Sequence, residues 1–148
     1  MQIKRLQIDN HLCLVDFDII FETVSGGSST ILIGENGTGK STMIECVLNI
    51  LMSFDSPAIE KRIDYSYSIE YDYAQKAVYI IKDNQSYCIT VNDACCEGSY
   101  SKVRSFIQIH SLFPQRIVAF YSGANNKLLP QIKQINKSYV KQCRDTLV

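Results

Sequence analysis

The sequence predicts an α/β fold with a mixed β-sheet, and three observations predict it. A short β-branched run, Thr30 to Ile33, ends at a glycine-rich turn that is followed by apolar residues at helical spacing. Residues 63–73 alternate apolar and polar side chains, which is typical of an antiparallel strand with one wet face. Ile117 to Tyr121 form an unbroken apolar run, as expected for a central parallel strand.

The totals favour one globular domain spanning residues 1–148. Hydrophobic residues make up 46% and charged residues 20% of the chain, which is ordinary globular usage. The amino terminus lacks the apolar core of a signal peptide, and no apolar run approaches the length of roughly 20 residues that a membrane span needs. We therefore expect a cytoplasmic protein with no membrane partner.

The net charge is zero, but the charges are unevenly distributed. Up to Glu97 there are seven Lys and Arg against fourteen Asp and Glu, whereas from Gly98 onward there are eight against one. The chain thus joins an acidic part to a basic tail.

Six cysteines are present, namely Cys13, Cys46, Cys88, Cys95, Cys96 and Cys143. They lack the C-x-x-C spacing of a zinc site, and in a reducing compartment they are most simply free thiols. A redox pair formed by the adjacent Cys95 and Cys96 is the less favoured alternative.

The first part of the chain, residues 1–54, is expected to contain strands, a turn and a helix. Residues 3–8 and 15–22 read as two strands, and residues 30–33 as a short buried strand. A helix is expected from Lys40 to about Phe54. Its expected buried face consists of Ile44, Val47, Leu48 and Leu51.

The second part, residues 63–92, is expected to form an antiparallel meander. Three strands read as Ile63 to Tyr73, then AVYIIK and SYCITV, which are joined across Asp83 and Asn84. The tyrosines of the first strand share one face with its isoleucines. A face packed on the core is the favoured interpretation, and a stacking platform for nucleic-acid bases is the alternative.

The third part, residues 99–148, is expected to contain a helix, the central strand 117–121 and a basic amphipathic helix. The first helix, Ser101 to Leu112, would turn Val103, Phe106, Ile107 and His110 inward. The last would carry a basic stripe of Lys133, Lys137, Lys141 and Arg144. This stripe fits either a solvated helix face or salt-dependent binding of DNA.

The chemistry is carried by the run Gly34-Glu35-Asn36-Gly37-Thr38-Gly39-Lys40-Ser41, which fits the Walker A pattern G-x-x-x-x-G-K-[ST] between a predicted strand and a predicted helix. The glycines allow the loop to turn its N–H groups toward a phosphate at the positive end of the helix. Lys40 would reach the β- and γ-phosphates of ATP and serve as the catalytic residue. Ser41 would bind Mg²⁺, and Thr42 would touch the α-phosphate.

The second acidic element that hydrolysis requires is missing. The runs YIIKD and CITVND come nearest to an apolar strand ending in Asp, but both belong to the expected meander, and Asp145 lies in the expected last helix. A GTPase is excluded because NKSY, residues 136–139, has Tyr where the base-reading motif requires Asp.

The order of these features resembles the amino-terminal lobe of ABC-type ATPases of the SMC and RecF class, often labelled AAA-family ATPases, which occur in bacterial DNA-repair and defence systems. Two segments carry the resemblance, IKRLQIDNHLCLVDFDIIF and TILIGENGTGKSTMIECVLNIL, within roughly the first 54 residues. It implies a P-loop NTPase lobe whose first helix follows the Walker A loop.

The resemblance also implies partners. A carboxy-terminal lobe would carry the signature motif and the Walker B acid, and a second ATPase head would complete a dimer around ATP and Mg²⁺. Neither motif is present here, so we expect this chain to be a truncated part of an ATPase. Asn10 matches the family pattern, whereas His11 stands at a usually aromatic position with no Arg after it. Asn125 or Asn126 is expected near the γ-phosphate.

Two other functions fit parts of the sequence. A self-contained P-loop kinase fits the chain length, but the Tyr-rich meander occupies the place of a lid. A non-enzymatic module that binds nucleic acid through its basic tail fits the charge distribution. The preferred expectation is an ATP-binding lobe that hydrolyses ATP only together with its missing partners.

Overall fold

The computed structural model describes residues 1–21 and 31–114 of the chain. These residues form one six-stranded sheet with the strand order β2-β1-β3-β4-β5-β6. The strands are β1 (Gln2–His11), β2 (Leu14–Ile20), β3 (Tyr67–Tyr73), β4 (Lys76–Asp83), β5 (Ser86–Val91) and β6 (Ala94–Gly98). The helices are α1 (Lys40–Ser53), α2 (Pro57–Glu60) and α3 (Tyr100–Ile109).

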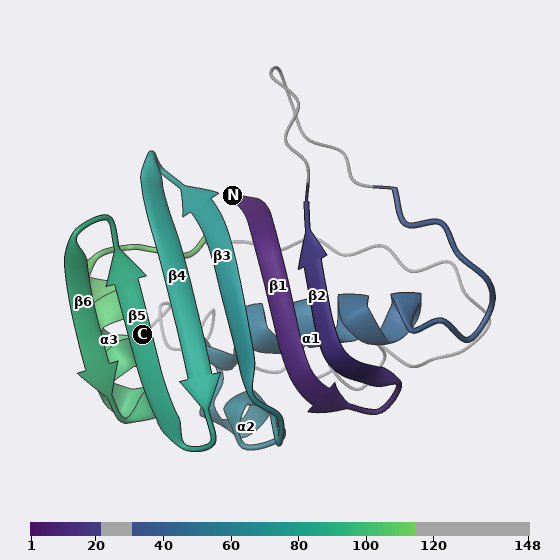
Figure 1. Cartoon of the computed structure of the whole chain (residues 1–148). Coiled ribbons are helices and arrows are strands. Elements are labelled where there is room, and N and C mark those ends of the chain that lie inside the picture. Colours follow the sequence, from purple (N-terminus) through teal and green to yellow (C-terminus); the bar gives the residue numbers. More distant parts are fainter. Residues whose placement is uncertain (22–30, 115–148) are drawn as a thin grey trace, which may run out of the picture.

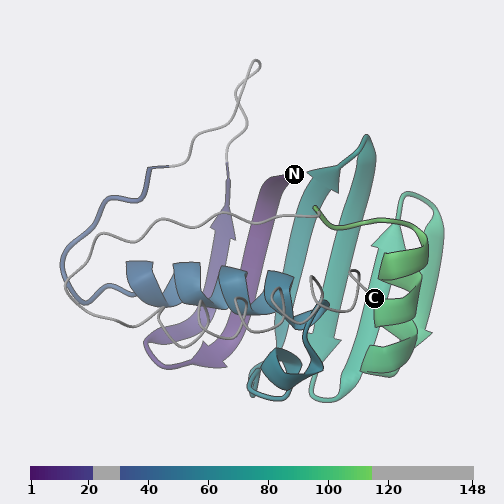
Figure 2. The ribbon, with the colours of Figure 1, turned by 180° about the vertical axis from the view of Figure 1, so that it is seen from behind.

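The helices lie on one face of the sheet. Figure 1 shows the sheet in front, and Figure 2 shows from behind that α1 crosses the strands nearest the amino terminus while α3 covers β5 and β6. The opposite face carries no described helix. The fold is therefore two-layered over the described residues, with its core between the sheet and the helices.

Short hairpins set the strand register. The turn between β3 and β4 consists of Ala74 and Gln75, both at positive φ, as the tight turns that match strand twist require. Asn84 and Asn92 also take positive φ in the two turns that follow. Asn92 adds a side-chain bond, because its Oδ1 accepts the backbone N–H of Ala77 at 3.2 Å.

The tyrosine stripe of β3 faces the core. Ile69 and Tyr71 are fully buried and Tyr67 is nearly so. The favoured interpretation of this stripe is thus confirmed, and no face remains there for stacking bases. The region expected to form a three-stranded meander holds β3, β4 and β5, and β6 extends the same antiparallel pattern. The first of these strands is shorter than expected, because β3 begins at Tyr67 and residues 63–66 form no strand.

The expected helix after the glycine-rich loop is present, but its buried face is rotated. Met43, Cys46 and Ile50 point into the core, whereas Ile44 is 43% exposed and Val47 and Leu48 are only half-buried. Of the four residues expected on the buried face, Leu51 alone is buried. The spacing of the buried three, i, i+3 and i+7, is as helical as the expected spacing. Periodicity alone therefore did not decide between two neighbouring apolar stripes.

The sheet is not mixed over the described residues, because every described strand pair is antiparallel. The expected buried strand 30–33 is wrong for its described residues. Residues 31–33 form no strand, and Ile31 and Ile33 are 80% and 91% exposed. β-branched residues favour strands only where a neighbouring strand pairs with them, and among the described residues no strand pairs with residues 31–33.

The helix expected at residues 101–112 is α3, which is shorter at its carboxyl end. Val103 and Ile107 are buried and Phe106 is half-buried, but His110 is exposed and was wrongly placed inward. Helix α3 ends at Ile109, so His110 lies beyond the face that packs on the sheet.

Several expectations fall outside the described residues. These are the strand 117–121, the basic helix with Lys133, Lys137, Lys141 and Arg144, and the single residues Asn125, Asn126, Cys143 and Asp145. Among the helices that the structure describes, none has the length and apolar character to cross a bilayer.

Candidate nucleotide-binding loop

The loop that precedes α1 has the backbone that its glycines predict. Gly37 and Gly39 take φ values of +93° and +91°, a conformation that residues with a Cβ rarely adopt. The loop turns twice in this way before the helix begins at Lys40. Its shape therefore depends on glycine at these two positions.

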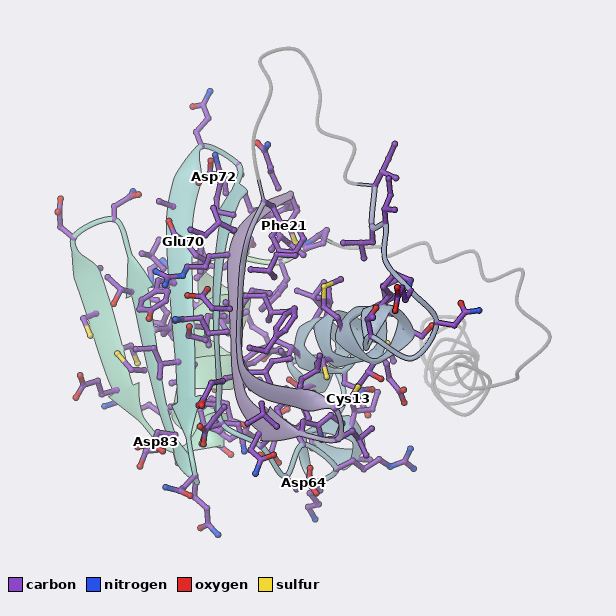
Figure 3. All side chains as sticks on the ribbon, turned by 45° about the vertical axis from the view of Figure 1, so that its right-hand side comes forward. Cys13, Phe21, Asp64, Glu70, Asp72 and Asp83 are labelled. Atoms are coloured by element: carbon purple, nitrogen blue, oxygen red, sulfur yellow. The ribbon has the colours of Figure 1, made fainter. Side chains whose placement is uncertain are left out.

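Gly39 has a second, steric reason to be glycine. A Cβ at this position would lie 2.9 Å from Leu14 Cδ2 and 3.1 Å from Cys13 Sγ. Both atoms belong to the start of β2 and the turn before it, and Leu14 is buried. The β1–β2 hairpin thus forms the wall against which the loop packs, and Figure 3 shows Cys13 on this hairpin beside α1.

Lys40 folds back over the loop. Its Nζ donates to the carbonyl oxygens of Gly34 and Glu35, each at 2.6 Å, and to Thr38 Oγ1 at 3.3 Å. Thr38 Oγ1 in turn donates to the Glu35 carbonyl at 2.9 Å. The ammonium group is therefore held in the loop by neutral acceptors, and no carboxylate of residues 1–21 or 31–114 forms an ion pair with it.

The amino terminus of α1 is open to an anion. Gly39 provides no side-chain cap, and the first turn contains no acidic residue. The N–H groups of a first helical turn have no partner inside the helix and carry the positive end of the helix dipole. Together with Lys40, they concentrate positive charge at one point.

Two hydroxyl groups stand in this first turn, on Ser41 and Thr42. Ser41 is exposed, so its side chain is accessible to a bound cation. Cys13 Sγ donates to Thr42 Oγ1 at 3.7 Å, so the hydroxyl proton of Thr42 remains available for another acceptor. No sequence pattern indicated a role for Cys13 here, because its contact depends on the packing of the hairpin on the loop.

Other residues that the sequence singled out lie elsewhere. The ring of His11 stacks at a tilt on Tyr65, with 4.3 Å between the ring centroids, and its Nδ1 lies 3.6 Å from Asp64 Oδ1. Asp83, at the end of YIIKD, accepts hydrogen bonds from Ser66 and Asn84. Strands β1 and β3 separate its strand from β2, so Asp83 belongs to the meander and not to the loop.

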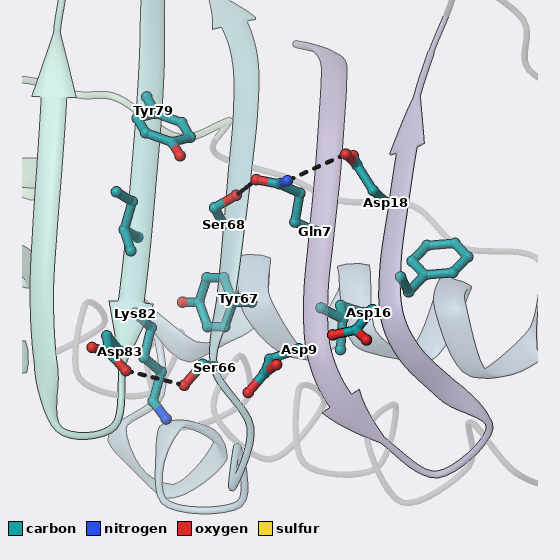
Figure 4. Close-up of a pocket in the computed structure, with 13 residues that line it drawn as sticks. Gln7, Asp9, Asp16, Asp18, Ser66, Tyr67, Ser68, Tyr79, Lys82 and Asp83 are labelled. Carbon is teal, nitrogen blue, oxygen red and sulfur yellow. Dashed lines mark hydrogen bonds between the residues drawn. The ribbon is translucent and has the colours of Figure 1, made fainter.

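A hollow of about 610 Å³ lies on the uncovered face of the sheet. Figure 4 shows its polar lining, in which Ser68 donates to Gln7 and Gln7 donates to Asp18. Four carboxylates line it, those of Asp9, Asp16, Asp18 and Asp83. Because these groups repel phosphate, the hollow is a poor site for a nucleotide, and the loop before α1 is the better one.

The described residues therefore define an α/β protein with a glycine-rich, lysine-bearing loop at the start of a helix. The AAA domain family model matches residues 5–142, which is most of the chain. The chain belongs to the AAA domain family, and this membership indicates a nucleotide-binding protein of the ATPase class. No curated protein and no solved structure shows significant similarity to the chain.

Proposed function

We propose that this chain binds MgATP through residues 34–42 and is the ATP-binding amino-terminal part of an SMC/RecF-like ATPase. The observation that carries the proposal is Lys40, whose Nζ sits among the loop carbonyls beside an uncapped helix terminus. An incoming β- or γ-phosphate would replace neutral carbonyls with a charged acceptor, which forms a much stronger bond with the ammonium group.

Each part of the loop has a role in the proposal. The N–H groups at Gly37, Gly39 and Lys40 would surround the β-phosphate, and Lys40 would balance the charge that develops on the γ-phosphate. Ser41 would bind Mg²⁺, and Thr42 would donate to the α-phosphate. Gly34, Glu35, Asn36 and Thr38 complete the loop.

Hydrolysis would require further parts, namely a carboxy-terminal lobe with a Walker B acid and a second ATPase head. Two observations support this extension. Among the described residues, Lys40 hydrogen-bonds only to neutral acceptors and forms no ion pair with a carboxylate. Ile31 and Ile33 present exposed apolar side chains just before the loop. A neighbouring strand would cover these side chains. No observation on the described residues favours the kinase alternative.

The test is the melting temperature of the 148-residue chain with and without MgATP. Ligand at a hundred times its dissociation constant adds about 2.7 kcal/mol to the free energy of unfolding, or roughly 5 to 10 °C. We expect this shift in the wild-type chain and its loss in Lys40→Ala. The matched control is Lys61→Ala, an exposed lysine at the end of α2, which should keep the full shift.

A second variant separates the nucleotide from the metal. Ser41→Ala should still bind ATP but lose the additional stabilisation that Mg²⁺ provides. No phosphate should be released by the wild-type chain on its own. An equal MgATP shift in wild type and Lys40→Ala would contradict the site, and turnover by the isolated chain would contradict the need for partners.

A further inference from the structure

The strands β5 and β6 bring together three groups that bind metals. Cys88 Sγ lies 3.6 Å from Cys95 Sγ and 3.6 Å from Glu97 Oε1, and Cys95 Sγ lies 4.0 Å from the same oxygen. Figure 1 shows β5 and β6 at the end of the sheet opposite β2, far from the loop before α1. They take no part in the proposed nucleotide site.

The register of the hairpin explains the cluster. Cys88 lies directly opposite Glu97, and Thr90 lies opposite Cys95. Alternate residues of a strand share a face, so Cys88, Cys95 and Glu97 all point away from the core, while Cys96 points toward it. The six residues between Cys88 and Cys95 are the reason that local spacing rules for zinc missed the pair.

The distances agree with the edges of a tetrahedron around one cation. Zinc binds sulfur at about 2.3 Å and carboxylate oxygen at about 2.1 Å, so tetrahedral geometry separates two sulfurs by about 3.8 Å and a sulfur and an oxygen by about 3.6 Å. All three separations are within a few tenths of an ångström of these values. The three ligand atoms thus need little movement to share one ion.

The same geometry is unfavourable for a disulfide. Cys88 and Cys95 are diagonal neighbours across the hairpin, and diagonal neighbours lie about 7 to 8 Å apart. Disulfides usually join residues whose Cα atoms are within about 6.8 Å. The described cysteines are all free thiols.

Lys102 lies beside the cluster, but no ion pair among the described residues joins it to the Glu97 carboxylate. The nearest amine, on Lys102, donates to the backbone carbonyl of Glu97 at 2.9 Å and not to its carboxylate. A hollow beside Cys88 and Glu97, lined also by Ser86 and Gly98, leaves space for a water as fourth ligand.

We propose that Cys88, Cys95 and Glu97 form a binding site for a thiophilic divalent cation of the zinc type, with one position left to water. Binding would release the two thiol protons, and the ion would then clamp β6, the edge strand of the described sheet, to β5. Two thiolates and a carboxylate favour zinc over magnesium or calcium, which prefer oxygen ligands.

The test uses Co²⁺ as a coloured probe for the reduced, nucleotide-free chain. We expect thiolate-to-cobalt charge-transfer bands and the visible bands of tetrahedral cobalt, which added Zn²⁺ removes. Cys95→Ser, at an exposed position, and the double variant with Cys88→Ser should lose the charge-transfer bands. Glu97→Gln should raise the dissociation constant by at least about tenfold. Cys96→Ser, one residue away on the opposite face, should behave as wild type.

Zn²⁺ should also raise the melting temperature of the wild type and of Cys96→Ser, but not of Cys95→Ser. If the wild-type chain shows no thiolate bands, or if Cys95→Ser keeps them, the proposal is wrong. Recovery of a Cys88–Cys95 disulfide whose reduced form binds no Co²⁺ would likewise overturn it. None of these outcomes depends on ATP binding.

Discussion

Gly37 and Gly39 have nearly the same backbone conformation but different surroundings. A Cβ at Gly37 would meet nothing within 4 Å, whereas a Cβ at Gly39 would press on Leu14 and Cys13. Alanine at φ near +90° costs about 1–2 kcal/mol at either site, judged by the strain of left-handed backbone. Alanine at Gly37 would therefore cause backbone strain alone, whereas alanine at Gly39 would cause the same strain and a steric clash.

We predict that Gly39→Ala lowers both stability and MgATP affinity more than Gly37→Ala does. The additional loss arises because Leu14 is buried and cannot move away without disturbing the core. Urea denaturation and a nucleotide titration of both variants would measure the difference. Equal effects would mean that the hairpin does not press on the loop in solution.

At the scale of elements, β3 contributes Tyr67, Ile69 and Tyr71 to the core. Two of its buried tyrosines, Tyr67 and Tyr71, differ in the hydrogen bonding of their hydroxyl groups. Tyr71 donates to the Leu112 carbonyl at 3.2 Å and so ties β3 to the segment after α3. The Tyr67 hydroxyl lies near Ser53 but makes no hydrogen bond to any described residue. Burial raises the pKa of both tyrosines, so neither ionises in the ordinary pH range.

We predict that Tyr71→Phe lowers the free energy of unfolding by about 0.5–1.5 kcal/mol, the net value of one hydrogen bond, with the Leu112 carbonyl left unpaired. Tyr67→Phe should be neutral or stabilising, because it removes a buried polar group that has no partner. Chemical denaturation of the two variants compares them directly. A larger loss in Tyr67→Phe would show that its hydroxyl is satisfied in solution.

Local patterns predicted the meander well because its signals are local. Alternation along β3 and the turn after β4 depend on neighbouring residues alone. The structure has this turn at Asn84 and Gln85, one residue later than expected, because Asp83 still pairs with Ser86. The strand expected at residues 30–33 failed because a buried strand is defined by distant partners. The buried face of α1 was misplaced for a similar reason, because it depends on how the helix packs on the sheet. This packing buries Met43 and Cys46 and leaves Ile44 exposed.

The candidate nucleotide loop was predictable because its residues are contiguous, and their order specifies both the turns and the helix start. The packing of the loop on Cys13 and Leu14 was not predictable, because the folding of the β1–β2 hairpin brings these residues next to Gly39. The cluster of Cys88, Cys95 and Glu97 depends in the same way on the register of β5 with β6. One-residue slippage of that register would turn the cysteines to opposite faces.

At the scale of the whole molecule, the proposed nucleotide site and the proposed metal site lie at opposite ends of the described sheet, since β2 and β6 are its two edges. The nucleotide site depends on the packing of β2 against the loop, and the metal site on the pairing of β5 with β6. We therefore expect ATP and zinc to stabilise the chain independently of each other.

The segment before the loop, residues 31–33, has both partly buried and exposed apolar side chains. Leu32 packs on the core, while Ile31 and Ile33 on either side of it face outward. Of the side chains of residues 31–33, only that of Leu32 therefore packs on the described core. Exposed apolar side chains contribute little to stability, whereas a partly buried leucine contributes in proportion to the area it removes from water.

We predict that Ile33→Ser changes the free energy of unfolding by less than about 0.5 kcal/mol, while Leu32→Ser costs about 1–2 kcal/mol. Denaturation at two protein concentrations makes the comparison decisive. If Ile33→Ser proved as costly as Leu32→Ser only at the higher concentration, a second copy of the chain would cover this surface. If Ile33→Ser were as costly as Leu32→Ser at both concentrations, residues of the same chain would cover Ile33. The exposed apolar surface that the proposed carboxy-terminal lobe would cover would then not exist.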